Sequence, residues 1–107
     1  MRTLTAEERS LLLYLMRKAG LQRPTDTWLD ERRVEDLRGD GVRSGFVLNK
    51  HADRDFDNLV SDVDFTDVDG IHVLASLFVD RNNNPYEVEI WKVDDTPLLV
   101  LPVFPNP

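Results

Sequence analysis

The chain has 107 residues, no cysteine and a formal net charge of -7 at pH 7. This length predicts a single domain over residues 1–107, built around one core. The lack of cysteine excludes disulfides, thiolate nucleophiles and zinc sites that use cysteine. The early apolar run at 11–16 is too short for a membrane span and lacks the basic flank of a signal peptide, so we expect a cytoplasmic protein.

The first predicted element is a helix over residues 6–19. Thr5 is a favourable N-cap, and Glu8 three residues later completes a capping box. The apolar residues of 11–16 give the helix a buried stripe, and Gly20 is placed to end it in a left-handed conformation. Residues 21–26, which include Pro24, then read as a connector.

The next segment, residues 28–38, fits either a short helix or a strand. Asp40-Gly41 follows it, and this pair favours a two-residue hairpin turn. We therefore expect an antiparallel hairpin of residues 32–38 and 43–49.

Beyond residue 50 the hydrophobic residues alternate, as in strands. Residues 71–79 are apolar on both faces and indicate a central strand. Asp69-Gly70 predicts a turn from a strand at 59–66, and the loop 81–85 leads into a strand at 86–93. The predicted fold class is α+β, with the N-terminal helix packed on an antiparallel sheet of about five strands.

The last predicted strand has two faces of different character. Tyr86, Val88 and Ile90 point toward the core, whereas Glu87, Glu89 and Trp91 point the other way. The second set predicts a solvated face that ends in an aromatic contact residue. Alternatively, Trp91 packs under residues 94–97 and anchors them.

Negative charge is concentrated in the second half of the chain. Residues 1–50 carry ten basic and eight acidic side chains, whereas residues 51–107 carry three basic and twelve acidic ones. Such a surface repels nucleic acid and anionic membranes and attracts basic proteins. The acidic run is a solvated loop, a partner surface or a cation site; its members are Asp53, Asp55, Asp57, Asp62, Asp64, Asp67 and Asp69.

Two stretches match catalytic or metal-binding patterns only in part. Residues 62–66 read D-x-D-x-T, the nucleophile motif of a phosphohydrolase superfamily, but the chain lacks the alternating strands and helices of that fold. Residues 80–91 resemble a calcium loop, but Pro85 replaces its glycine and Trp91 its bidentate glutamate. We therefore expect no catalytic residue, no metal site and no cofactor.

The C-terminal half resembles a family of small, uncharacterised bacterial domains that end near a W-K-x-D-x-x-P-L motif. The motif is present here as Trp91-Lys92, Asp94 and Pro97-Leu98. Some members look like immunity proteins of polymorphic or contact-dependent toxin systems. At Asp95 the family pattern has an aromatic residue, so this chain departs there. The resemblance implies a binding role and no catalytic residues.

Charge and resemblance together predict a non-enzymatic immunity protein that neutralises a cognate basic toxin domain, for example a nuclease. The residues expected to bind this partner are Asp53, Asp55, Asp57, Asp62, Asp64, Asp67, Asp69, Glu87, Glu89 and Trp91. Two alternatives stay open. One is a divalent-metal phosphohydrolase that uses the same carboxylates, and the other is a structural module of a larger complex.

Overall fold

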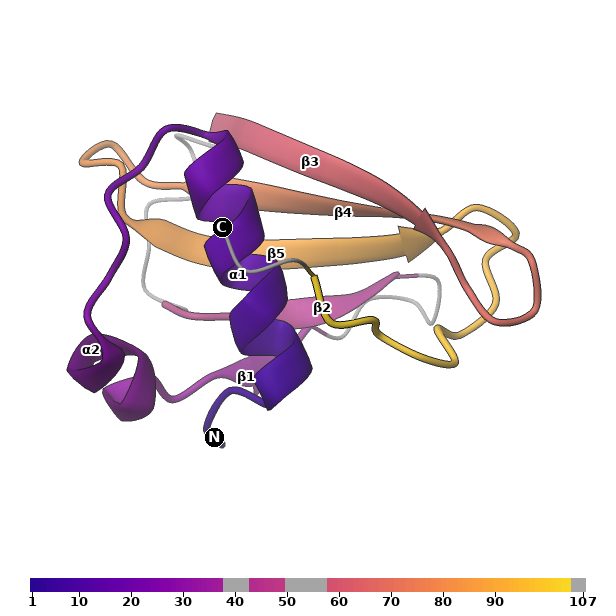
Figure 1. Cartoon of the computed structure of the whole chain (residues 1–107), viewed down its shortest axis with the longest axis horizontal. Coiled ribbons are helices and arrows are strands. Elements are labelled where there is room, and N and C mark those ends of the chain that lie inside the picture. The colour runs from indigo at the N-terminus through magenta and orange to yellow at the C-terminus, as the bar shows by residue number, and fades with distance from the viewer. Residues whose placement is uncertain (38–42, 50–57, 105–107) are drawn as a thin grey trace.

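The computed structural model of the chain describes residues 1–37, 43–49 and 58–104. In these described residues, two helices precede and partly cover a five-stranded antiparallel sheet with the strand order β1-β2-β5-β4-β3. The elements are α1 (Ala6–Lys18), α2 (Asp26–Glu31), β1 (Glu35–Asp36), β2 (Arg43–Val47), β3 (Asn58–Thr66), β4 (His72–Val79) and β5 (Pro85–Lys92). The predicted α+β class is confirmed (Figure 1).

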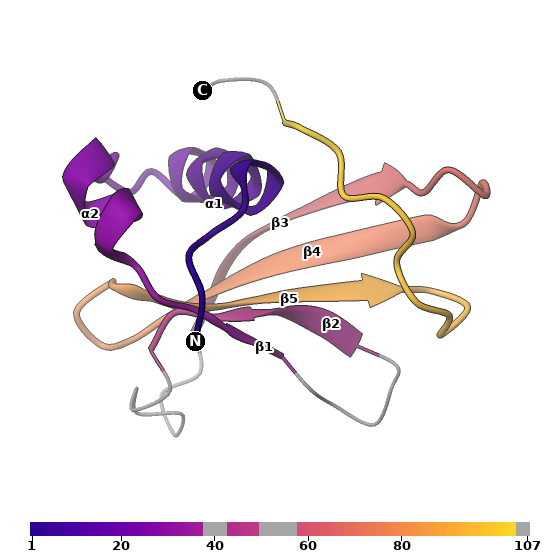
Figure 2. The ribbon, with the colours of Figure 1, turned by 90° about the horizontal axis from the view of Figure 1, so that it is seen from below.

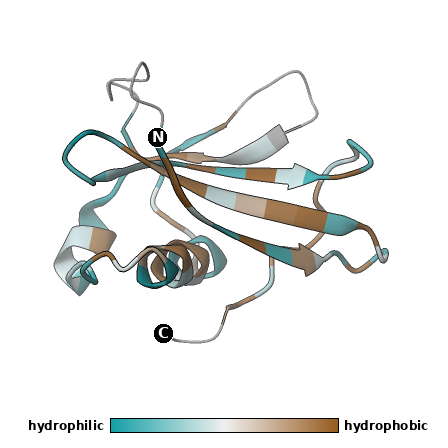
Figure 3. Cartoon of the chain, turned by 90° about the horizontal axis from the view of Figure 1, so that it is seen from above, coloured by the Kyte–Doolittle hydropathy of each residue, from teal (hydrophilic) through white to brown (hydrophobic). Residues whose placement is uncertain are grey.

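Both helices lie on the same side of the sheet (Figure 2). We call the sheet face toward α1 the inner face and the opposite one the outer face. Figure 3 shows hydrophobic residues along the strands and hydrophilic residues in several of the turns that join them. None of the helices in the described part of the chain is long and apolar enough to cross a membrane.

The first helix forms as its capping residues predict. The Thr5 hydroxyl accepts a hydrogen bond from the Glu8 amide, and the Glu8 carboxylate accepts one from the Thr5 amide. Gly20 has a φ of 75° and ends the helix. The apolar stripe is buried against the sheet, and the Ser61 hydroxyl of β3 donates to the Leu15 carbonyl at 2.7 Å.

The short helix α2 was not predicted. The interpretation of residues 21–26 as a connector is wrong at its end, because Thr25 caps a helix that begins at Asp26. The Thr25 hydroxyl accepts a hydrogen bond from the Trp28 amide at 3.1 Å. The hairpin that follows is confirmed, with Glu35 paired to Val47, although β1 is shorter than predicted. Its Asp40-Gly41 turn lies outside the described residues.

The predicted meander of three strands is also confirmed, as β3, β4 and β5 pair in chain order. The inward residues of β4 are fully buried, namely Val73, Ala75, Leu77 and Val79. In β5 the predicted core residues Tyr86, Val88 and Ile90 are buried. Because β2 pairs with the other edge of β5, the last strand in sequence stands in the middle of the sheet.

The contact between β2 and β5 depends on a glycine. Gly45 has a φ of 125°, and a Cβ atom added there would lie 2.0 Å from the Val88 carbonyl oxygen. No side chain fits at that distance, so this position requires glycine.

Candidate functional site

The structure brings four of the predicted partner-binding residues onto one surface. In the sheet register, Asp64 pairs with Leu74, which in turn pairs with Trp91. One step along, Asp62 pairs with Ser76, and Ser76 with Glu89. Directly paired residues point to the same face of a sheet. Asp62, Asp64, Glu89 and Trp91 therefore share the outer face, and we call these four residues the acidic outer surface.

The two aspartates are its most accessible members. Asp62 and Asp64 are exposed on β3, whereas Glu89 and Trp91 are half-buried on β5. Asp64 lies beside His72, with 3.2 Å between His72 Nε2 and Asp64 Oδ2. Strands are spaced about 4.8 Å apart, so the surface spans roughly 10 Å from β3 to β5. It offers carboxylates beside an aromatic ring.

Glu87 does not belong to this exposed surface. Its side chain was expected on a solvated face, but only 7% of the residue is accessible. The reason is its position on the central strand, where Val47 and Phe78 flank it from both sides. The expectation of solvent exposure is therefore wrong for Glu87.

Trp91 anchors the turn that follows β5. Its indole Nε1 donates a hydrogen bond to Asp95 Oδ1 at 2.9 Å. Asp95 has a φ of 64°, a conformation that asparagine and aspartate tolerate better than most residues. The carboxylate at position 95 thus binds the tryptophan directly.

Asp67 and Asp69 lie close to Lys92, a buried cation. The Lys92 side chain is 2% exposed, and its Nζ lies 2.9 Å from Asp67 Oδ2 and 2.6 Å from Asp69 Oδ2. The Asp67 side chain is fully buried, so it is not an accessible contact residue as the sequence analysis expected. Asp69 is partly exposed but paired.

The Asp67 carboxylate also holds the C-terminal segment. It accepts hydrogen bonds from the amides of Leu99 at 2.8 Å, Val100 at 3.1 Å and Val68 at 2.7 Å. Further along, the Phe104 amide donates to the Ser10 hydroxyl, and the Phe104 ring packs 5.2 Å from that of Tyr14. This cluster is therefore a structural element that fixes residues 98–104 against the fold.

These contacts favour the charged forms of both Asp67 and Lys92. Burial opposes ionisation of Asp67, but hydrogen bonds from Leu99, Lys92, Val68 and Val100 outweigh it and hold the pKa well below its usual range. Burial likewise opposes the charge of Lys92, but its bonds to Asp69 and Asp67 prevail and raise the pKa.

We predict that stability falls in acid because of Asp67. An unfolded aspartate takes up its proton near pH 4, whereas folded Asp67 resists protonation to lower pH. The contribution of ionised Asp67 to the stability of the fold is therefore complete above about pH 4 and is lost progressively below it. Glu8 contributes in the same direction, so its stabilising effect is also lost in acid. Burial opposes the ionisation of Glu8, but its hydrogen bond from Arg2 lowers the pKa.

Urea denaturation at pH 7 and at pH 2.5 measures this dependence. The Asp67→Asn variant, which cannot ionise at this position, should lose less stability between the two pH values than the unaltered protein. An equal loss in both proteins would show that Asp67 does not contribute.

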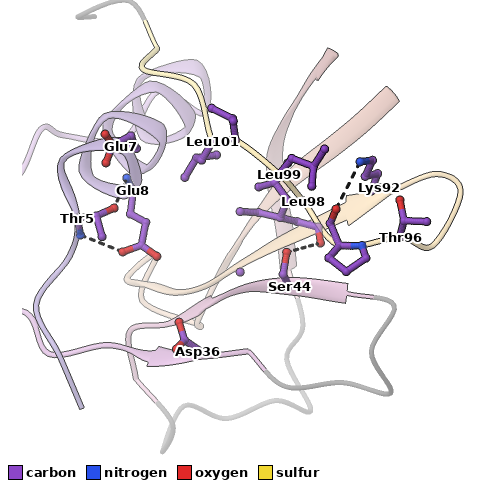
Figure 4. A pocket seen from close by; sticks show the side chains of 14 residues that line it. Thr5, Glu7, Glu8, Asp36, Ser44, Lys92, Thr96, Leu98, Leu99 and Leu101 are labelled. Carbon is purple, nitrogen blue, oxygen red and sulfur yellow. Dashed lines mark hydrogen bonds between the residues drawn. The ribbon is translucent and has the colours of Figure 1, made fainter. Parts of the chain in front are cut away.

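A groove of about 600 Å³ lies on the inner face, between α1, the strands and the C-terminal segment (Figure 4). Glu7 and Glu8 line it from the helix, Ser44 from β2, and Leu99 from the C-terminal segment. Two of its charged groups are already engaged, since Glu8 binds Arg2 and Lys92 binds the two aspartates. We assign no chemistry to this groove.

The remaining predicted residues, Asp53, Asp55 and Asp57, lie outside the described residues. Within residues 1–37, 43–49 and 58–104, no group of three or more histidine or carboxylate side chains is arranged to hold a metal ion.

Sequence reasoning missed the role of Lys92, although the sequence contained a signal for it. Lys92 continues the inward alternation of Val88 and Ile90, and a lysine at an inward position needs carboxylate partners. Asp67 and Asp69 supply them from the turn that joins β3 and β4.

Comparison with known proteins leads to one family. The family model described as "Domain of unknown function (DUF6984)" matches residues 1–102, nearly the whole chain. No curated protein and no solved structure matches it. This chain therefore belongs to the DUF6984 family of domains of unknown function.

Proposed function

We propose that this protein is a cytoplasmic, non-enzymatic immunity protein that binds and neutralises a basic toxin domain. The observation that carries the proposal is the acidic outer surface, where exposed Asp62 and Asp64 share one sheet face with Glu89 and half-buried Trp91. The resemblance around Trp91-Lys92 supplies the toxin context. Toxins that act on nucleic acid bind their substrate through positively charged surfaces, which are complementary to this one.

The arrangement suits recognition of a cationic protein. Both helices pack on the inner face and leave the outer face free of helices in the described part of the chain (Figure 2). Aromatic residues are enriched at the centre of protein interfaces, and charged residues at their rim. Trp91 and Leu74 occupy the middle strands, while Asp62 and Asp64 lie toward the edge. Complementary charge of this kind mainly accelerates association.

The test begins with capture of the partner and ends with a rate measurement. The immobilised protein is exposed to an extract of its source cells, and a retained basic protein is purified and assayed for toxicity. We expect stoichiometric inhibition by the unaltered protein. In the Asp62→Asn/Asp64→Asn variant the association rate should fall by about tenfold at low salt, while the dissociation rate changes little.

Glu31→Lys is the matched control, because it changes the net charge by the same amount at an exposed position on α2. It should leave the association rate within about twofold of the original. Equal effects of the two variants would assign the attraction to net charge alone. If a toxin is inhibited but its association rate is the same for the Asp62→Asn/Asp64→Asn variant, the acidic outer surface is not the binding site.

A further inference from the structure

Among the strands of residues 1–37, 43–49 and 58–104, β3 forms one edge of the sheet, with β4 as its neighbour. It is nine residues long, and Asp62, Asp64 and Thr66 are exposed along it. We infer that this edge accepts an extended, cationic segment of the partner as a sixth, antiparallel strand. The inference rests on the proposed function and adds to it the chemistry and geometry of the partner segment.

The backbone of β3 is oriented for such an addition. The Asp67 amide donates to the Ile71 carbonyl at 2.9 Å, so these two residues form a hydrogen-bonded pair at the end of the hairpin. Hydrogen-bonded and non-bonded pairs alternate along an antiparallel ladder. Phe65 and Val63 therefore bond to β4, whereas the amide and carbonyl groups of Asp62, Asp64 and Thr66 point away from it.

An independent contact confirms this orientation. The ammonium group of Lys18, at the end of α1, donates a hydrogen bond to the Asp62 carbonyl oxygen. That oxygen is therefore turned outward at the edge of the sheet. The amide groups of Asp64 and Thr66 continue the same outward row, which gives an added strand the bonding pattern that peptides use when they extend a sheet.

The negative charge of Asp62 and Asp64 indicates which kind of segment would pair with β3. Residues that face each other across an antiparallel pair share a sheet face and interact, and like charges placed opposite each other are destabilising. A second copy of β3 centred on Asp64 would place two aspartates opposite each other. A segment with arginine or lysine at alternate positions instead pairs these cations with Asp62 and Asp64 on the outer face.

The inner face of the sheet determines which residues should alternate with the basic residues of the partner segment. Val63 and Phe65 point toward α1 and pack against the hydrophobic core, and the Phe65 ring lies 5.7 Å from that of Phe104. Residues opposite them are thus best apolar. The expected partner segment alternates basic and apolar residues over the length of β3.

The probe is a short synthetic peptide of alternating arginine and valine, blocked at both ends and labelled for fluorescence anisotropy. Two N-methylated forms test the hydrogen bonding, because methylation removes one amide donor at each site. The arginines face Asp62 and Asp64, so methylation of the arginine amides should weaken binding at least tenfold. Methylation of the valine amides, which point away from β3, should leave binding within about twofold.

Amide hydrogen exchange locates the bound strand. We expect slower exchange at Asp62, Asp64 and Thr66 when the unmethylated peptide is added, and binding roughly tenfold weaker in the Asp62→Asn/Asp64→Asn variant but not in Glu31→Lys. Equal binding of the two methylated peptides would overturn strand addition and leave charge recognition, and so the proposed function, intact. A dimer in light scattering with these amides protected would make a second copy the occupant instead.

Failure of the proposed function itself gives a different result. If neither the peptide nor any basic protein binds at low salt, recognition of cations fails, and the strand addition fails with it. If a captured toxin depends on Asp62 and Asp64 but the peptide does not bind, only the strand addition is overturned.

Discussion

Replacing Gly45 by alanine is expected to prevent the chain from folding or to reduce its stability by more than about 4 kcal/mol. The added Cβ would lie 2.0 Å from the Val88 carbonyl oxygen and 3.1 Å from the Glu89 Cα. Both neighbours belong to the backbone of β5, the central strand, so neither can move aside as a flexible side chain would. The φ of 125° adds backbone strain that only glycine avoids.

Soluble yield and urea denaturation followed by circular dichroism measure this effect. Gly20→Ala is the matched control, because Gly20 also has a positive φ, 75°, but nothing lies within 4 Å of the added Cβ. It should cost only about 1 kcal/mol. If the two variants lose the same stability, the close approach of β2 and β5 is not what requires glycine at position 45.

The second large effect is expected for Lys92→Met. This change removes the ammonium group from between Asp67 and Asp69 and leaves the buried Asp67 carboxylate without its cation. An uncompensated buried charge is strongly destabilising. We expect the melting temperature to fall by on the order of 10 °C. Residues 98–104 should also become sensitive to protease, because Asp67 holds the amides of Leu99 and Val100.

Two further variants separate charge from packing. Lys18→Met makes the same charge change at an exposed position and should shift the melting temperature by only a few degrees. Adding Asp67→Asn to Lys92→Met removes the unpaired carboxylate and should restore part of the loss. A double variant that is less stable than Lys92→Met would contradict the charge argument.

Local patterns predicted the helix α1 and the meander well. The capping box of Thr5 and Glu8 and the alternation of Val73, Ala75 and Leu77 are both set by neighbours within a few residues. The helix α2 was missed because Pro24 and the polar residues after it look like a loop until Thr25 is recognised as an N-cap.

The candidate site was predicted less completely, because its character depends on contacts distant in sequence. Asp62 and Asp64 are exposed as expected, and Glu89 and Trp91 share their face. Asp67 looks like another surface aspartate until Lys92, 25 residues later, is placed beside it. Glu87 follows the alternation correctly, but its burial results from strands on both sides, which alternation within one strand does not reveal.

The position of β5 in the middle of the sheet has a consequence for synthesis. Its pairs with β2, from Val47–Glu87 to Arg43–Trp91, join residues 40 to 48 positions apart. Contacts of such separation close large loops and slow folding. On the ribosome, the first hairpin has no neighbouring strand until residues 85–92 emerge, so the nascent chain carries unfinished sheet edges for most of its translation. The last strand to be made is the one that joins the two halves.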